Sequence, residues 1–99
     1  MSYRIEYTPR ARDHLAGLRK QDATTVVDTV GRKLAETPTA PTRSLKVLRA
    51  NQVALYELRV GALRVYYDVE EGPDPVVLVK AVGVKDRSLV RIGGEVIEL

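Results

Sequence analysis

The first part of the chain carries the apolar spacing of a strand followed by a helix. Residues 2–7 alternate Tyr3, Ile5 and Tyr7 with polar positions, which is typical of a half-buried strand. Thr8 can cap the free amides of a helix, and Pro9 suits the first helical position, where no amide hydrogen is needed. We therefore predict a strand over residues 2–7 and a helix from Pro9 to about Lys20. Its inward positions are Ala11, Leu15 and Leu18.

A second helix is predicted between Asp22, which can act as its cap, and Pro38, which it cannot cross. Apolar residues three and four positions apart form its inward face: Ala23, Val26, Val27, Val30 and Leu34. Residues 38–43 hold two prolines, so we expect a connector without regular structure.

Beyond the connector the apolar period changes to two. Residues 53–60 and 63–70 are predicted strands joined at Gly61-Ala62, where glycine supplies the positive φ of a type II′ turn. This turn sets the register of the hairpin. The apolar face, to be covered by the helices, pairs Val60 with Leu63, Leu58 with Val65, and Tyr56 with Tyr67. The opposite face pairs Arg59 with Arg64, Glu57 with Tyr66, and Leu55 with Asp68.

The C-terminal third contains one strongly apolar run. Residues 76–84 are almost continuously apolar, which is typical of a central strand buried on both faces. Residues 85–91 are a short polar stretch, and residues 95–99 can form a last edge strand. The predicted fold class is α+β: a strand, a two-helix hairpin, and a three-stranded, mostly antiparallel meander, with the helices packed on one face of the sheet.

Composition limits the possible chemistry. The 99 residues fit one domain spanning residues 1–99, and no apolar run reaches the length of a membrane span. Without cysteine, and with His14 as the one histidine, thiolate metal sites, multi-histidine metal sites and the usual histidine-paired triads are excluded. We expect no metal or cofactor, no membrane partner and a cytoplasmic location. His14 is expected at the surface or boundary of its helix.

The net charge of +3 hides a segregated distribution. Residues 43–64 carry five cations against one carboxylate, and residues 80–91 carry four against one. Residues 65–79 between them carry four carboxylates and no cation. Arg59 opposite Arg64 is a like-charge pair, which destabilises a sheet unless an anion lies nearby. This pattern suggests a phosphate or nucleic-acid ligand. The alternative is that both arginines are ordinary solvated strand residues.

Several segments together resemble the RelE/ParE toxins of bacterial type II toxin–antitoxin operons. The segments, in chain order, are residues 3–7 leading into residues 8–15, Lys46-Val-Leu-Arg49, Leu58-Arg59 with Gly61, Arg64-Val-Tyr-Tyr67, and Ala81-Val-Gly-Val-Lys-Asp-Arg87. Each is a weak motif alone, but their order and spacing extend over most of the chain. The resemblance implies a RelE-like fold in one domain.

The resemblance also implies an activity. In the ribosome-dependent mRNA endonucleases of this family, the sheet face away from the helices binds RNA and supports metal-free cleavage at the 2′-hydroxyl. Arg64 would then hold the scissile phosphate, Lys85 would supply a second cation, and Glu57 could serve as general base. Flanking phosphates and bases would be held by Lys46, Arg49, Arg59, Tyr66 as a stacking ring, Arg87 and Arg91.

The chain departs from the mRNA-cleaving pattern at three positions. Leu55 and Glu57 stand where the best-known nucleases have lysines, and Arg91 stands where they have a terminal tyrosine. The departures leave open a second function, that of a ParE-like inhibitor of DNA gyrase, and a third, that of a non-toxic relative which binds an antitoxin. Glu57 could also serve only to balance charge. All three alternatives imply a cognate antitoxin with an acidic, apolar segment.

Overall fold

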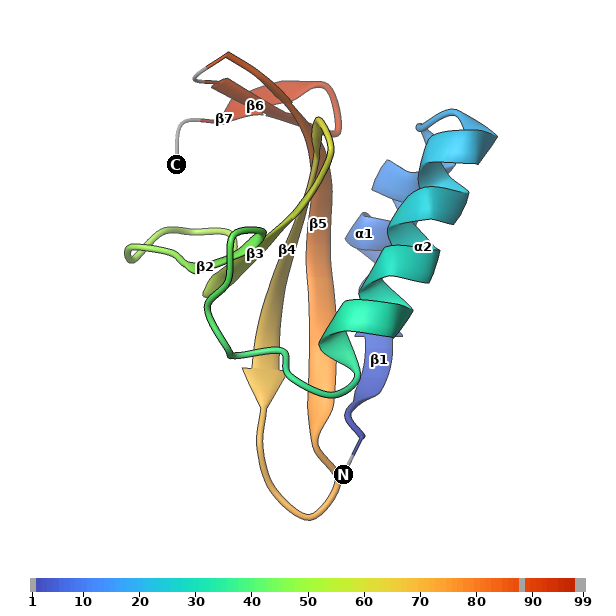
Figure 1. The fold of residues 1–99 in the computed structure, drawn as a ribbon. Coiled ribbons are helices and arrows are strands. Elements are labelled where there is room, and N and C mark those ends of the chain that lie inside the picture. Colours follow the sequence, from blue (N-terminus) through green and yellow to red (C-terminus); the bar gives the residue numbers. More distant parts are fainter. Residues whose placement is uncertain (1, 88, 98–99) are drawn as a thin grey trace.

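The computed structural model describes residues 2–87 and 89–97, and in it two helices cover one face of a seven-stranded sheet (Figure 1). The helices are α1 (Pro9–Ala16) and α2 (Lys20–Leu34). The strands are β1 (Arg4–Tyr7), β2 (Leu45–Val47), β3 (Tyr56–Val60), β4 (Leu63–Glu70), β5 (Val76–Asp86), β6 (Leu89–Ile92) and β7 (Glu95–Ile97). The predicted α+β class is confirmed. Neither helix in these ranges is long and apolar enough to cross a membrane.

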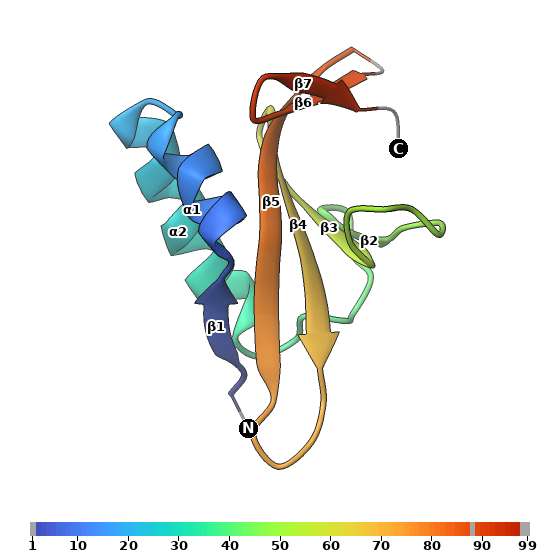
Figure 2. The same cartoon turned by 180° about the vertical axis from the view of Figure 1, so that it is seen from behind.

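Strand β5 lies at the centre of the sheet. Its first edge pairs with β4 in antiparallel orientation. Its second edge is shared by two strands in succession, β1 in parallel orientation from Val76 to Val79 and β6 in antiparallel orientation from Gly83 onward (Figure 2). The strand predicted from the apolar run is therefore confirmed, and it extends to Asp86.

Helix α1 fills the gap between β1 and β6 on that second edge. The Thr8 amide donates to the Val79 carbonyl at 3.0 Å, and the Thr8 hydroxyl donates to the Lys80 carbonyl at 3.3 Å. The Val82 amide donates to Nδ1 of His14 at 3.1 Å. Backbone groups that no strand reaches are thus bonded by the N-cap residue and by a residue in the last turn of α1, as buried backbone requires.

The predicted hairpin register is confirmed from the pair of Tyr56 with Tyr67 to the pair of Val60 with Leu63. The predicted pair of Leu55 with Asp68 is not part of the ladder, because Leu55 lies before β3 and its amide donates to the Asp68 carboxylate at 2.8 Å. Gly61 has a φ of +61°, Ala62 keeps a negative φ, and Val60 lies opposite Leu63, as a type II′ turn requires. The Tyr56 and Tyr67 rings stack with centroids 5.3 Å apart, and the Tyr67 hydroxyl donates to the Pro38 carbonyl at 2.6 Å.

Two apolar cores lie on the two faces of the sheet. The larger core joins the helices to the sheet; among its members are Ala11, Val26, Val30, Leu34, Leu58, Val65 and Tyr67. The smaller core lies on the opposite face, where the β6–β7 hairpin and the loop before β3 cover it: Val53, Ala54, Tyr66, Ala81, Val90 and Ile92. The face predicted to be open is therefore partly covered.

The helix boundaries differ from those predicted. Helix α1 ends at Ala16 because Gly17 is its C-cap and the chain turns before Arg19. Helix α2 begins at Lys20, so Asp22 lies in its first turn and pairs with Arg19 at 3.5 Å instead of capping the helix. In the first turn, the Asp22 carboxylate still stabilises the helix, because it lies near the positive end of the helix dipole. Val27 was predicted to face inward, but it is 45% exposed. It lies beside the buried face of α2, which is formed by Val26, Thr29, Val30 and Leu34.

Three strand predictions need correction. Strand β3 begins at Tyr56, three residues later than predicted, because the Asn51 side chain holds the preceding residues in a turn. Its Oδ1 accepts from the amides of Val53 and Ala54 at 2.7 and 3.0 Å. Strands β2 and β6 were not predicted, and β6 occupies part of the stretch read as polar. The last edge strand is confirmed for Glu95–Ile97, while residues 98–99 lie outside the described residues.

Gly83 permits β6 to fold over β5. A β-carbon at this position would lie 2.6 Å from the Arg91 carbonyl oxygen and 2.8 Å from the Ile92 side chain. The first contact is with backbone, so only movement of β6 could relieve it.

We predict that Gly83→Ala lowers the free energy of unfolding by about 1–3 kcal/mol, because the added methyl group overfills this contact. Gly31→Ala is the matched control, since a β-carbon there meets nothing within 4 Å and alanine favours a helix by about 0.5–1 kcal/mol. Urea unfolding of both variants measures the two changes. Equal stability of Gly83→Ala and wild type would contradict this account of β6.

Candidate functional site

The sheet face away from the helices gathers most of the predicted site residues. Arg59 on β3 lies opposite Arg64 on β4. In the neighbouring row, Lys46 on β2 lies opposite Glu57, which lies opposite Tyr66. Side chains that are directly opposite share a face with β-carbons about 4.5–5.5 Å apart. The predicted like-charge pair of arginines is therefore real.

Lys85 belongs to the same face. Alternate residues of a strand share a face, and Gly83 on β5 lies opposite Arg64. Lys85 is exposed two residues beyond Gly83, and its amide donates to the Ala62 carbonyl at 2.8 Å. The cation is therefore at the end of the face that is marked by the β3–β4 turn.

Arg64 is a buried cation that has no carboxylate partner among the described residues. Its side chain is 6% exposed, and Nη1 donates to the carbonyls of Gly61 and Leu63 at 2.8 and 2.9 Å. Nε has no hydrogen-bond partner, and Arg64 takes part in none of the ion pairs among the described residues. The two turn carbonyls hold the guanidinium beside Arg59, but they do not neutralise it. Such a group favours an anion.

Tyr66 does not offer a stacking surface in this structure, contrary to expectation. It is 0% exposed and packs in the smaller core. Burial raises the pKa of its hydroxyl, and the Glu57 carboxylate raises it further. The hydroxyl therefore stays protonated at neutral pH, and it has no hydrogen-bond partner among the described residues.

The three remaining predicted RNA contacts are dispersed. Arg91 lies on the opposite side of β6 from Val90 and Ile92, and it lines a cleft with Arg10 and His14 on the helix side. Arg91 was expected among the RNA contacts, but the alternation along β6 points it away from the face that carries Arg64. Arg87 is exposed in the β5–β6 turn, with a φ of +60°, and Arg49 is exposed after β2.

In the part of the chain that the structure describes, carboxylates and the histidine are too scattered to form a metal centre. Across residues 2–87 and 89–97, no three histidine, aspartate or glutamate side chains gather in a group that could hold a metal ion. The chemistry available on the face comes from guanidinium, ammonium and carboxylate groups.

Comparison with known proteins identifies the family. The model of the ParE toxin of type II toxin–antitoxin systems, parDE, matches residues 5–89. The chain belongs to the RelE/ParE toxins of type II toxin–antitoxin systems.

The fold of the toxin also matches a solved structure. A chain of the toxin–antitoxin complex RelBE2 from Mycobacterium tuberculosis superposes with a TM-score of 0.71 at 23% sequence identity. The match covers 86% of the toxin and 100% of the other chain. A search of curated proteins finds no significant match.

His14 of the toxin has a structural role that the sequence did not reveal. It was expected at the surface of its helix or at the boundary of the buried face, and it is half-buried. Besides accepting from Val82, its ring lies under the β6–β7 turn, where a β-carbon on Gly93 would approach Nε2 to 2.9 Å. Burial lowers the pKa of His14, the Arg10 charge lowers it further, and Asp13 opposes both. Arg91 lines the same cleft. The neutral ring thus joins α1, β5 and the turn.

We predict that the toxin loses stability as the pH falls below about 6.5, the ordinary pKa of histidine. Between the ordinary pKa of histidine and the lowered pKa of folded His14, the unfolded chain binds a proton at this residue and the folded protein does not. The free energy of unfolding therefore falls with pH until the pKa of folded His14 is reached. His14→Asn keeps an acceptor at the same distance along the side chain and does not titrate. Its unfolding should depend less on pH between 7 and 5, as urea titrations can measure. Parallel pH profiles for both proteins would contradict the role of His14.

Proposed function

We propose that the toxin is a metal-independent, ribosome-dependent mRNA endonuclease that a cognate antitoxin neutralises. The observation that carries this proposal is Arg64, a buried guanidinium with a free Nε and no carboxylate partner among the described residues. The like-charged Arg59 lies directly opposite, so an anionic ligand would relieve both groups. A phosphodiester supplies that anion.

The proposed reaction is attack of a 2′-oxygen on the adjacent phosphorus. Glu57 accepts the 2′ proton, the bond from phosphorus to the 5′-oxygen breaks, and a cyclic phosphate and a 5′-hydroxyl are formed. Arg64 stabilises the charge that develops on the phosphoryl oxygens, and Lys85 stabilises the leaving 5′-oxygen, which takes its proton from solvent water. Contact with Arg64 requires movement of the residues that cover it.

The neighbouring cations complete the proposed RNA surface. Lys46 and Arg59 share the face with Glu57 and Arg64, and both are exposed. Together with Arg49 and Arg87, which lie at its margins, they would hold phosphates of the flanking nucleotides. Tyr66 cannot stack on a base while it is buried.

The proposed partners follow from the family. We expect an antitoxin encoded beside this chain, acidic and partly disordered when free. We also propose that the toxin acts in the cytoplasm, where ribosomes and gyrase are found, and that it needs no cofactor.

Inhibition of DNA gyrase is the second candidate function. Two observations favour it: Tyr66 is buried, and Arg91 lies on the other side of the sheet from Arg64. The set of RNA contacts is thereby smaller than the sequence predicted. A gyrase inhibitor acts through an interaction surface and needs neither a general base nor a stacking ring. The family model that matches the chain is also that of ParE toxins.

We predict that Arg64→Met combined with Lys85→Ala lowers ribosome-dependent mRNA cleavage by at least about 100-fold, because both stabilisers of transition-state charge are lost. Methionine preserves the length of the buried arginine stem and lacks its charge. Arg12→Met, an exposed change on α1, is the matched control and should leave cleavage unchanged. Full cleavage by the double variant would contradict the assignment of the site.

Two parallel assays separate the two candidate functions. If the toxin is a nuclease, primer extension on ribosome-bound mRNA shows new 5′ ends while supercoiling by purified gyrase is unaffected. If it inhibits gyrase, supercoiling fails and the mRNA stays intact. The toxin is also expressed in the absence of an antitoxin. If growth continues and both the mRNA and gyrase supercoiling are unaffected, the protein is a non-toxic relative that binds an antitoxin.

A further inference from the structure

A cavity of about 560 Å³ lies on the helix side of the sheet, between α1, β5 and the β6–β7 turn. Its apolar lining comes from Leu18, which follows α1, and from Val82 and Val84 on β5. Small-molecule sites in proteins typically have volumes of about 300–1,000 Å³ and apolar walls with a few polar groups. This cavity, which we call the α1–β6 cavity, therefore has the size and the lining of a small-molecule site.

Two guanidinium groups line the α1–β6 cavity, from Arg10 on α1 and from Arg91 on β6. Arg91 lies opposite Val84 in the β5–β6 ladder. Neither arginine takes part in an ion pair among the described residues. Asp13, the carboxylate in the lining, pairs with neither of them. The cavity thus carries a net positive charge and is complementary to an anion.

His14 adds a third hydrogen-bond donor to the cavity. It is four residues beyond Arg10, so the two side chains are neighbours on α1. Its Nδ1 accepts from the Val82 amide, and burial lowers the pKa of the ring, so at neutral pH the hydrogen is on Nε2. No described residue accepts from Nε2. Gly93 lies beside this nitrogen, where a β-carbon would approach it to 2.9 Å, so glycine leaves room next to the donor.

We propose that the α1–β6 cavity binds a small organic oxyanion, which is a phosphate monoester or a carboxylate that carries an apolar group. The oxygens of the ligand accept from the two guanidinium groups and from Nε2 of His14, and its apolar part contacts Leu18 and Val84. Guanidinium groups bind both kinds of head group through paired hydrogen bonds, which are strong because both partners are charged. Arg64 lies on the opposite face of the sheet, so binding in this cavity does not depend on RNA cleavage at that face.

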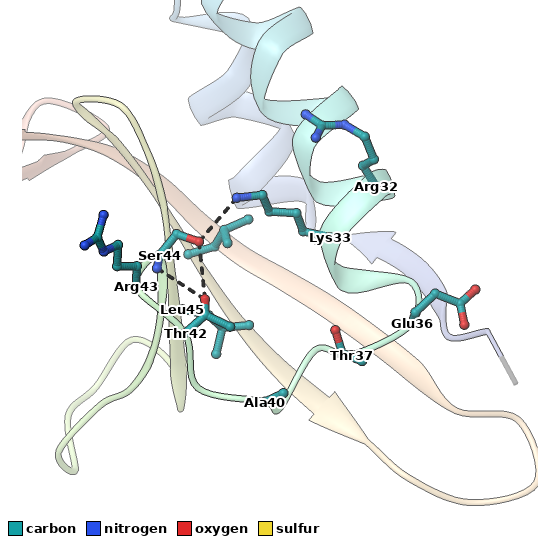
Figure 3. A pocket seen from close by; sticks show the side chains of 10 residues that line it. Arg32, Lys33, Glu36, Thr37, Ala40, Thr42, Arg43, Ser44 and Leu45 are labelled. Atoms are coloured by element: carbon teal, nitrogen blue, oxygen red, sulfur yellow. Dashed lines mark hydrogen bonds between the residues drawn. The ribbon is translucent and has the colours of Figure 1, made fainter.

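A second cationic cavity of the same chain supplies a matched control (Figure 3). It has a volume of about 400 Å³ and lies between the C-terminal part of α2 and the segment that leads into β2. Arg32 lines it, and Lys33 donates to the Ser44 hydroxyl at 3.3 Å. Arg32→Gln therefore removes the same charge as Arg10→Gln, from a cavity to which His14 does not contribute.

The experiment is an NMR titration of the full chain at neutral pH with two probes, phenyl phosphate and benzoate. The chain has one histidine, so the ring signals of His14 are assigned without ambiguity. We expect at least one probe to shift these signals saturably, with a dissociation constant below about 1 mM. The probe that saturates at the lower concentration identifies the head group. Inorganic phosphate, which has no apolar part, should bind at least about five-fold more weakly than phenyl phosphate.

Charge variants test which residues hold the probe. Arg10→Gln and Arg91→Gln should each raise the dissociation constant by about ten-fold, because each removes a charged donor. Asp13→Asn should lower it, because a like charge is removed from the cavity. Arg32→Gln and Arg64→Met should each change it by less than about two-fold. Unfolding midpoints equal to wild type establish that the Arg10, Asp13 and Arg91 variants are folded.

Four outcomes would overturn the proposal. In the first, neither probe shifts the His14 signals saturably. In the second, Arg10→Gln and Arg91→Gln bind as tightly as Arg32→Gln. In the third, Arg64→Met abolishes the shift, which would locate the probe on the other face of the sheet. In the fourth, inorganic phosphate and phenyl phosphate bind equally well, and the apolar wall then takes no part in binding.

Discussion

The hydrogen bonding of strand β5 is the constraint on which the rest of the structure depends. Both faces of this strand are covered, so its amides and carbonyls need partners along both edges. Strand β4 satisfies one edge, whereas β1 and β6 each satisfy only an end of the other. Thr8 and His14 bond the backbone left between them. Helix α1 is consequently oriented by specific hydrogen bonds as well as by apolar packing.

The same strand also determines what becomes of the basic face. Because Gly83 lacks a side chain, β6 can approach β5 closely, and the hairpin that follows covers Tyr66. The burial leaves the Tyr66 hydroxyl and Nε of Arg64 without partners among the described residues. Unpaired buried polar groups are costly, and functional sites are where proteins retain them. The covered face thus keeps a buried cation, Arg64, whose Nε could still bond an anion.

Local sequence patterns were sufficient to predict the structure where a residue type favours one backbone conformation. Gly61 specified the β3–β4 turn, and the turn specified the opposition of Arg59 and Arg64. Errors arose where tertiary contacts decided. Strand β3 starts late because the Asn51 side chain bonds the amides before it, and β2 and β6 are short strands whose pairing comes from β3 and β5. Short polar segments carry too little alternation to be recognised as strands.

The sequence by itself therefore determined the α+β class, the hairpin register, the central strand and the face shared by Glu57, Arg59 and Arg64. These features follow from side-chain alternation and turn chemistry, which are local properties. The tertiary structure alone decided that Tyr66 is buried, that Arg91 faces the helix side, and that His14 bonds Val82. Each of these depends on where the β6–β7 hairpin and α1 meet β5, and contacts between segments so distant in sequence leave no periodic signal in the chain.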